Sequence, residues 1–290
     1  MSTVNASVPP TGALFEGAEV VLEGRRIVKE FSLGGRSVPW GSRRTMRAVD
    51  EVDVELRRGM VTALVGQSGS GKSTLGRILA QLIPQTSGAI VLEGRTVKAR
   101  GGREFREYTG DVQLTLQDPF ASLNPLRRIS YTLGRAVRIH QQVSGNDEVR
   151  SRCTQLLARV GLEPAEHYLD RFPHELSGGE RQRVSFARAL AAGPKVLLAD
   201  EPVSMLDTSI RKEMLDLIDA LRRDEQLAVL YITHDLGSAR RYSDEVLVMH
   251  EGRVVERGLS AQVIDDPQDD YTKRLLAAAP DPRRRADARS

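Results

Sequence analysis

Residues 66–74 combine closely spaced glycines with a lysine and hydroxyl side chains, and they read Gly66-Gln67-Ser68-Gly69-Ser70-Gly71-Lys72-Ser73-Thr74. This spacing lets successive backbone N–H groups wrap a polyphosphate, because side chains at the glycine positions would block that approach or the positive φ values that it needs. Lys72 is suited to neutralise β- and γ-phosphate oxygens, and the Ser73 hydroxyl is suited to bind Mg²⁺. The stretch therefore predicts a site for a nucleoside triphosphate.

A second constellation of polar residues follows the apolar run Val196–Ala199. If that run is a buried strand, Asp200 lies at its C-terminal edge, where ligands bind in open α/β sheets and where Mg²⁺ needs an oxygen ligand. Glu201 then lies beside it and can polarise a water molecule for in-line attack on the γ-phosphorus. Alone, such an acidic pair also fits a turn; together with residues 66–74 it predicts hydrolysis of the bound nucleotide.

The flanking segments are the elements that such a site requires. Val61–Val65 is a short apolar run typical of a strand, and Ser73–Ile83 is predicted to be a helix. A loop between a strand and a helix places phosphates at a helix N-terminus, where free N–H groups and the helix dipole favour anions.

The rest of the chain alternates strand and helix patterns. Strands are predicted at 18–31, 46–56, 89–92, 112–116, 196–199, 228–232 and 245–250, and helices at 129–142, 147–160, 179–192 and 209–223, with a further short helix before the last strand. Residues 34–44 are predicted to form a surface loop, and residues 1–17 to be disordered. Strands that alternate with helices predict a parallel sheet covered on both faces, with a helical insertion at about residues 120–190.

Composition excludes several classes of protein. The chain has 290 residues, a net charge of +3 and a single cysteine, Cys153, which excludes an intramolecular disulfide and a cysteine-cluster metal site. No apolar run is long enough for a membrane span, and the N-terminus lacks the pattern of a signal peptide, so we expect a soluble cytoplasmic protein. Arg283, Arg284, Arg285 and Arg289 form a basic tail that we expect to be solvated rather than bound to lipid or nucleic acid.

The stretch Leu176-Ser177-Gly178-Gly179-Glu180-Arg181-Gln182-Arg183 resembles the signature sequence of ATP-binding-cassette (ABC) ATPases. Other landmarks of that family follow in register: Gln117 resembles the Q-loop glutamine, Ser204–Asp207 the D-loop and His234 the switch histidine. Phe31 is the best candidate for the aromatic residue that stacks on adenine, and Trp40 is the weaker one. The resemblance implies an α/β fold: a P-loop NTPase core with a parallel sheet, an antiparallel β subdomain at the N-terminus, and an inserted α-helical signature subdomain.

The resemblance also implies roles for individual residues. Glu201 would be the general base, and His234, Gln117 and Lys72 would complete the catalytic set. Ser73, Gln117 and Asp200 would surround Mg²⁺, with Phe31 on the base and residues 66–74 on the phosphates of ATP. Ser177, Gly178, Gly179 and Glu180, with Asp207, would act on the ATP held by an opposite subunit. Independently of the family, the Gly178 and Gly179 amides precede a helix and so suit an anion.

Two further stretches resemble the subfamily that energises oligopeptide and dipeptide importers. Residues 117–125 resemble its Q-loop region, and Tyr271–Leu276 with Pro280 resembles its C-terminal extension. The implied organisation is a disordered N-terminus at 1–17, an ABC ATPase domain at 18–262, and the extension with its basic tail at 263–290. Three positions depart from the family pattern: Glu180 replaces glutamine, Met205 replaces a small residue, and Asp269-Asp270 replaces His-Pro.

The predicted partners are transmembrane permease subunits, a second ABC ATPase subunit that is either another copy or a paralogue, and indirectly a substrate-binding protein, but no nucleic acid. This places the chain peripherally at the cytoplasmic face of the membrane. The alternatives are a subunit of an exporter, and a soluble ABC ATPase acting on nucleic acid or ribosomes. Exporters often fuse the cassette to a membrane domain, and the soluble class usually carries two cassettes or a long coiled coil. The sequence names no cargo, and peptides lead by resemblance.

Overall fold

The structure is a computed structural model that describes residues 15, 17–33, 44–97, 101–118 and 123–278. Several sequence predictions fall outside these residues. They are the disordered N-terminus apart from residues 15 and 17, the surface loop predicted at 34–44 apart from Arg44, Trp40, residues 119–122 of the Q-loop region, Pro280 and the basic tail. Arg44 is not in a loop but begins a strand.

The largest sheet has six strands in the order β10-β9-β3-β8-β7-β6. Its strands are β3 (Val61–Val65), β6 (Val112–Thr115), β7 (Val196–Asp200), β8 (Ala228–Thr233), β9 (Glu245–His250) and β10 (Arg253–Leu259). Every pair is parallel except β10 with β9. The predicted parallel sheet is therefore confirmed, with one antiparallel strand added at its edge.

Both faces of this sheet are buried, which explains why its strands are continuous apolar runs. Along β8, Val229 and Tyr231 point into one core that is shared with the helical region and α9 (Leu236–Tyr242). Ala228 and Leu230 belong to a second core beneath the antiparallel sheet. Strand alternation thus sends neighbouring residues to opposite cores.

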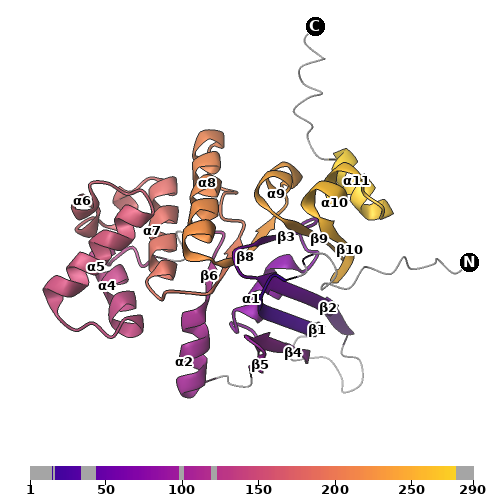
Figure 1. The fold of residues 1–290 in the computed structure, drawn as a ribbon, viewed down its shortest axis with the longest axis horizontal. Coiled ribbons are helices and arrows are strands. Elements are labelled where there is room, and N and C mark those ends of the chain that lie inside the picture. Colours follow the sequence, from indigo (N-terminus) through magenta and orange to yellow (C-terminus); the bar gives the residue numbers. More distant parts are fainter. Residues whose placement is uncertain (1–14, 16, 34–43, 98–100, 119–122, 279–290) are drawn as a thin grey trace, which may run out of the picture.

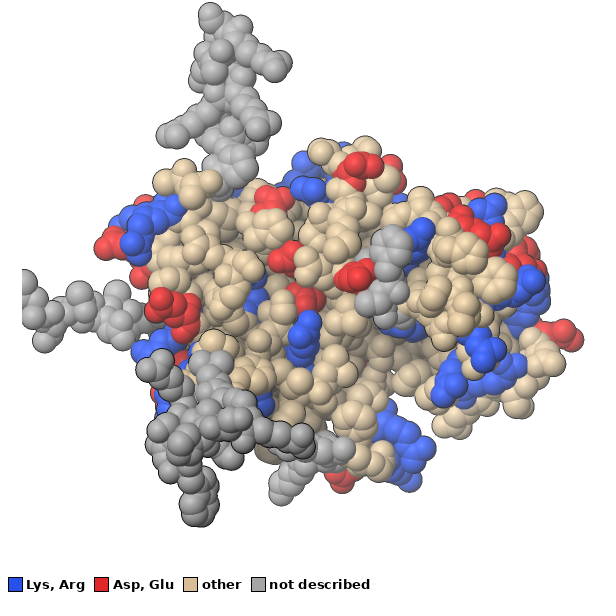
Figure 2. Space-filling model, turned by 180° about the vertical axis from the view of Figure 1, so that it is seen from behind, with Lys and Arg blue, Asp and Glu red and all other residues tan. Residues whose placement is uncertain are grey.

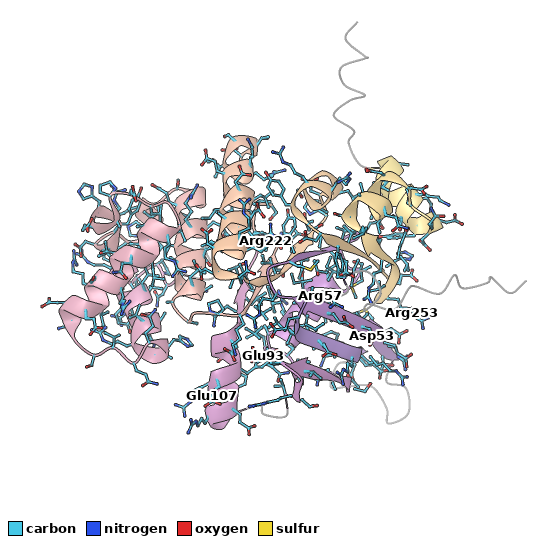
Figure 3. The ribbon with its side chains drawn as sticks, in the orientation of Figure 1. Asp53, Arg57, Glu93, Glu107, Arg222 and Arg253 are labelled. Carbon is cyan, nitrogen blue, oxygen red and sulfur yellow. The ribbon has the colours of Figure 1, made fainter. Side chains whose placement is uncertain are left out.

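The second sheet is antiparallel and has four strands in the order β2-β1-β4-β5. It consists of β1 (Val20–Leu33), β2 (Arg44–Arg57), β4 (Ser87–Leu92) and β5 (Arg95–Thr96). Arg253 of β10, which is labelled in Figure 3, donates to the Asp50 carboxylate of β2 over 2.7 Å and so joins the two sheets. The antiparallel subdomain predicted for the N-terminal part is confirmed.

The helical region lies to one side of both sheets (Figure 1). It consists of α4 (Ile129–His140), α5 (Asn146–Arg159), α6 (Ala165–Leu169) and α7 (Gly178–Leu190), with a short 3-10 turn η2 (Pro173–Glu175) before α7. Cys153 is buried in α5, where burial raises the pKa of its thiol to about 11. The helices predicted in this insertion are confirmed, and α6 is additional.

The remaining helices are α1 (Lys72–Leu79), α2 (Gly102–Asp111), α8 (Thr208–Glu225), α10 (Ser260–Asp265) and α11 (Asp270–Ala278). The helix predicted to run to Ile83 was too long, because Gln81 takes a left-handed φ of +57° and turns the chain. Helices α2, α10 and α11 and strands β5 and β10 were not predicted.

The described surface carries charges of both signs. On the face shown in Figure 2, acidic and basic side chains are interspersed. Among the described residues no helix combines the length and the apolar character that crossing a bilayer needs.

Candidate nucleotide-binding site

A cavity of about 950 Å³ opens at the C-terminal edge of the parallel strands. Many of the residues that line it follow those strands directly. The glycine-rich loop follows β3, Glu201 follows β7, His234 follows β8, and Glu251 follows β9. The carboxyl ends of parallel strands meet at one edge, so segments far apart in sequence converge there.

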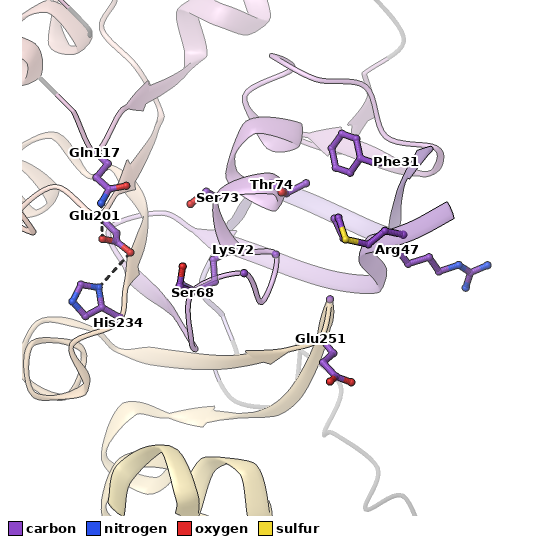
Figure 4. A pocket seen from close by; sticks show the side chains of 15 residues that line it. Phe31, Arg47, Ser68, Lys72, Ser73, Thr74, Gln117, Glu201, His234 and Glu251 are labelled. Atoms are coloured by element: carbon purple, nitrogen blue, oxygen red, sulfur yellow. Dashed lines mark hydrogen bonds and ion pairs between the residues drawn. The ribbon is translucent and has the colours of Figure 1, made fainter. Parts of the chain in front are cut away.

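The structure brings together most of the residues predicted for the site. Those that line the cavity are Phe31, Ser68, Gly69, Gly71, Lys72, Ser73, Thr74, Gln117, Glu201 and His234. Figure 4 shows Glu201 between Gln117 and His234 on one side, Phe31 on the other, and the glycine-rich loop between them. The cavity therefore has an aromatic end and a polar end, joined by the loop.

The loop conformation depends on two glycines. Gly66 has a φ of +150°, and a Cβ there would lie 2.1 Å from the Met249 carbonyl oxygen. Gly71 has a φ of +106°, and a Cβ there would lie 2.1 Å from the Ala48 carbonyl oxygen. Both positions thus exclude any side chain, as the sequence predicted.

Lys72 is curled back over the loop. Its Nζ donates to the carbonyl oxygens of Gly66 (2.7 Å) and Gln67 (2.8 Å), and the side chain is buried. Burial lowers the pKa of this amine, while the charges of Glu201 and Asp200 act in the opposite direction. The ammonium group therefore lies where an anion bound by the loop would meet it.

Asp200 lies behind the cavity wall rather than in its lining. It is 3% exposed, and its Oδ1 accepts a hydrogen bond from the Ser73 hydroxyl over 3.0 Å. Burial raises the pKa of this carboxyl, partly offset by the Ser73 hydrogen bond. A hydroxyl and a buried carboxylate thus lie together at the N-terminus of α1, and both are hard oxygen ligands for a metal ion.

Glu201 is the centre of a polar triplet. Its Oε2 accepts from Gln117 Nε2 over 3.0 Å, and its Oε1 lies 3.3 Å from His234 Nδ1. Glu201 also has a φ of +45°, which non-glycine residues adopt only when their surroundings enforce it, and its N–H donates to Ile232 O. The carboxylate is therefore aimed into the cavity by a strained backbone.

Other predicted residues are placed elsewhere. Gly66, Gln67 and Ser70 belong to the loop but do not line the cavity. Ser177, Gly178, Gly179 and Glu180 form the N-terminus of α7, and Asp207 precedes α8; none of these lines the cavity either. Ser177 caps α7: its Oγ accepts from Glu180 N over 3.3 Å, and Glu180 Oε2 accepts from Ser177 N over 2.8 Å.

The cavity also contains residues that sequence reasoning missed: Met46, Arg47, Ala48, Glu251 and Gly252. A signal for them existed. Met46 is the cross-strand partner of Phe31, so pairing the two predicted N-terminal strands would have found it. Glu251 and Gly252 follow the predicted strand 245–250 at the same edge as the other ligand-facing residues.

A parallel sheet with a glycine-rich phosphate loop and an Asp-Glu pair at its C-terminal edge defines a P-loop ATPase. The chain belongs to the ABC transporter family, whose family model matches residues 49–204. As an ABC-type ATPase it binds and hydrolyses ATP.

Two curated relatives narrow the family. The oligopeptide transport ATP-binding protein OppF of Lactococcus lactis is 42% identical over 244 residues, which cover 83% of this chain and 76% of OppF. The glutathione import ATP-binding protein GsiA of Shigella dysenteriae is 42% identical over 262 residues, covering 90% of this chain but 41% of GsiA. The two relatives are thus ATP-binding proteins, one of oligopeptide transport and the other of glutathione import.

Solved structures agree with the fold. The chain matches cbiO1 from Clostridium perfringens, part of the ABC transporter complex cbiONQ, with a TM-score of 0.71 and 27% identity over 85% of this chain and 91% of that one. A dimeric ATP-binding cassette in a post-hydrolysis state, bound to ADP and Pi, matches with a TM-score of 0.71 and 24% identity over 82% of this chain and 98% of that one. The predicted fold class is confirmed.

Proposed function

We propose that this chain hydrolyses MgATP to drive the import of oligopeptides, dipeptides or glutathione-like peptides through membrane permease subunits. The observation that carries the proposal is the single cavity in which Lys72, Glu201 and His234 converge. The identities to OppF and GsiA support the peptide cargo. By this proposal the chain lies peripherally at the cytoplasmic face of the membrane and receives cargo indirectly from a substrate-binding protein.

ATP would lie along the cavity from its aromatic end to its polar end. Phe31 is 37% exposed, which leaves its ring open to stack on adenine. The backbone of Gly66–Thr74, with the N-terminus of α1, would hold the phosphates. Lys72 would exchange its carbonyl partners in the loop for phosphate oxygens.

The residues at the mouth of α1 fit Mg²⁺. Ser73 and Asp200 supply oxygen atoms 3.0 Å apart, and Gln117, whose Nε2 donates to Glu201, would supply its Oε1 to the metal. Among the described residues no group of three or more His, Cys, Asp and Glu could hold a metal. Mg²⁺ suits such a site, because it is usually held by one or two protein oxygens together with substrate phosphates. When bound, it would neutralise charge on the phosphate oxygens.

Glu201 would act as the general base. Its carboxylate would take a proton from water as the water oxygen forms a bond to the γ-phosphorus and the bond to the β-γ bridging oxygen breaks, releasing ADP and phosphate. His234, at 3.3 Å from the carboxylate, would orient the water and the γ-phosphate. Gln117 would fix the other carboxylate oxygen.

The N-terminus of α7 would serve a second cassette. Ser177 is exposed, and the site lies outside this chain's own cavity, so its anion would come from ATP held by a facing subunit. Asp207 would contribute across the same interface. The partner is either another copy of this chain or a paralogous cassette, and the dimeric cassette that matches this fold supports such a pairing.

The segment after Gln117 would transmit hydrolysis to the permease. It leads into the helical region, where Leu126 is 82% exposed and Tyr131 46% exposed. Exposed apolar side chains of this kind suit a protein partner. Loss of the γ-phosphate would change what Gln117 contacts, and the helical region would then rotate with the docked permease.

The direct test is a pull-down of the tagged full-length chain from native membranes under MgATP, with identification of the proteins that co-purify. We expect permease subunits with several membrane spans, and any paralogous cassette would appear with them. Recovery of ribosomes or nucleic acid without a permease would overturn the importer proposal and favour the soluble class. Recovery of an exporter permease would overturn the direction of transport.

A further inference from the structure

The C-terminal helix α11 reaches the phosphate loop through one hydroxyl group. Tyr271, in the first turn of α11, accepts a hydrogen bond from the backbone N–H of Gln67 over 3.1 Å. Its side chain is 7% exposed, and its ring stacks on His250 at the end of β9 with centroids 3.8 Å apart. The hydroxyl is therefore held in place by a ring that is itself fixed by the sheet.

Both backbone polar groups of Gln67, its N–H and its carbonyl, form hydrogen bonds that hold the loop. Its carbonyl oxygen accepts from Lys72 Nζ over 2.8 Å and from Ser70 N over 3.2 Å. Its N–H donates to the Tyr271 hydroxyl. The hydrogen bond to Tyr271 thus fixes the residue whose carbonyl group aims the lysine.

Helix α11 is itself anchored by carboxylates. Asp269 Oδ1 accepts from the backbone N–H groups of Tyr271 (2.7 Å) and Thr272 (3.3 Å), which caps the helix. Glu256 of β10 accepts from the backbone N–H groups of Gln268 (2.7 Å) and Asp269 (3.2 Å). Asp269, one of the residues that departs from the family pattern, thereby fixes the turn that carries Tyr271.

We propose that Tyr271 is a positioning residue for ATP binding, acting through Gln67 to hold the phosphate loop in its binding conformation. This inference rests on the proposed nucleotide site at residues 66–74. A loop held in advance loses less conformational entropy when ATP binds, so the hydroxyl group raises affinity without touching the nucleotide. The C-terminal extension is then part of the nucleotide site in function as well as in packing.

The test is Tyr271→Phe in the full-length chain, which removes the hydroxyl group but keeps the ring on His250. We expect the Kd for MgATP, and equally for MgADP, to rise about three- to tenfold, the loss that one intramolecular hydrogen bond accounts for. The kcat at saturating MgATP stays within about twofold, because Tyr271 does not face the reacting atoms. Isothermal titration and steady-state ATPase assays measure the two quantities.

The matched control is Tyr242→Phe, which removes a hydroxyl group that donates to Asp216 rather than to the loop. It leaves the Kd unchanged. A merely structural role for Tyr271 would lower the thermal midpoint and the active fraction but not the Kd of the folded protein. An unchanged Kd in Tyr271→Phe, whatever its thermal midpoint, overturns the proposal.

A second pair of variants tests the anchor. Asp269→Ala removes the helix cap and is expected to weaken MgATP binding in the same direction as Tyr271→Phe, whereas Asp269→Asn keeps a capping side chain and is expected to match the wild type. Equal affinities for both variants overturn the role of the cap. A wild-type chain that does not bind MgATP would instead overturn the nucleotide site at residues 66–74.

Discussion

The two helix N-termini that follow glycine-containing motifs are completed in different ways. Helix α1 begins after Gly71, which is left-handed and offers no side-chain cap. Helix α7 begins after Ser177, whose hydroxyl group forms a reciprocal capping box with Glu180. The N-terminal donors of the first helix therefore have no side-chain cap and suit a bound anion, whereas the first turn of the second helix is capped by a side chain of this chain.

The N-terminus of α1 also differs from that of α7 in the side chains around it. Among the described residues, those that we assign to ATP hydrolysis lie beside α1. Lys72, Ser73 and Glu201 converge there, whereas the N-terminus of α7 carries no base or lysine of the motif. By our proposal, the residues at the α1 terminus bind and hydrolyse ATP within this chain, and those at the α7 terminus complete the nucleotide site of a facing subunit. The difference predicts that substitutions beside α1 change ATP binding or hydrolysis by the single chain, whereas substitutions at the N-terminus of α7 leave ATP binding by the single chain unchanged.

The largest effect is expected for Glu201→Gln at the α1 pocket. Removing the carboxylate should lower kcat by about 10²–10⁴ while the Kd for MgATP changes by no more than about twofold, because the amide keeps the size of the side chain and one acceptor oxygen but cannot accept the proton. Glu213→Gln on the exposed face of α8 is the control. ATPase assays with matched titrations check both values, and normal turnover in Glu201→Gln would remove Glu201 from the role of base.

The next largest effect is expected on MgATP binding, where substitutions of the glycines at the two helix N-termini should differ. Gly71→Ala combines a φ of +106° with a Cβ 2.1 Å from Ala48 O, so we expect MgATP binding to weaken at least about 30-fold. Gly179→Ala meets only the Ile210 side chain, at 2.8 Å, and should leave MgATP binding by the monomer unchanged. Gly69→Ala, strained but unobstructed, should lie between them. Equal losses for Gly71→Ala and Gly179→Ala would contradict the distinction.

A smaller difference concerns two glutamates whose pKa values shift in opposite directions. Burial raises the pKa of Glu245, at the start of β9 beside Thr62 of β3, to about 7, despite the opposing charge of Arg257. Burial also opposes ionisation of Glu180 in the α7 cap, but hydrogen bonds from Ser177 and Tyr168 outweigh it and lower the pKa of that carboxyl. Protonation of Glu245 thus stabilises the folded sheet, whereas protonation of Glu180 destabilises the cap of α7.

The shifted pKa values of Glu245 and Glu180 contribute to the pH dependence of the free energy of unfolding. The contribution of Glu245 is fully present below its unfolded pKa of 4.5 and is lost as the pH rises through about 7. We expect the free energy of unfolding to fall by about 1–3 kcal/mol across that window, and Glu245→Gln to flatten the fall. The contribution of Glu180 is lost in the opposite direction, as the pH falls below its ordinary range. Urea titrations at several pH values check this; an equal fall in Glu245→Gln would contradict it.

Much of the pocket could be predicted because its residues lie at fixed distances from strands that are legible in the sequence. The apolar runs before Gly66, Asp200 and His234 identify parallel strands, and their polar successors must then meet at one edge. Family resemblance added Phe31 and Gln117, which no local pattern identifies. The structure places both beside the loop.

Two of the elements that were not predicted, α2 and β10, lack a regular apolar pattern for physical reasons. Helix α2 buries Tyr108 alone, so it shows no apolar stripe. Strand β10 buries the charged residues Glu256 and Arg257, which interrupt strand alternation. The contact between Tyr271 and Gln67 spans 204 residues, so no local pattern can indicate it.

The most direct test of the distinction between the two helix termini is MgATP binding by the monomeric chain, compared for Lys72→Ala and Ser177→Ala. Lys72→Ala should weaken binding about 10- to 100-fold, because it removes a charged donor to phosphate. Ser177→Ala should bind within about twofold of the wild type, because its site belongs to ATP on a facing subunit. Comparable losses in both variants would contradict the account and place Ser177 in this chain's own nucleotide site.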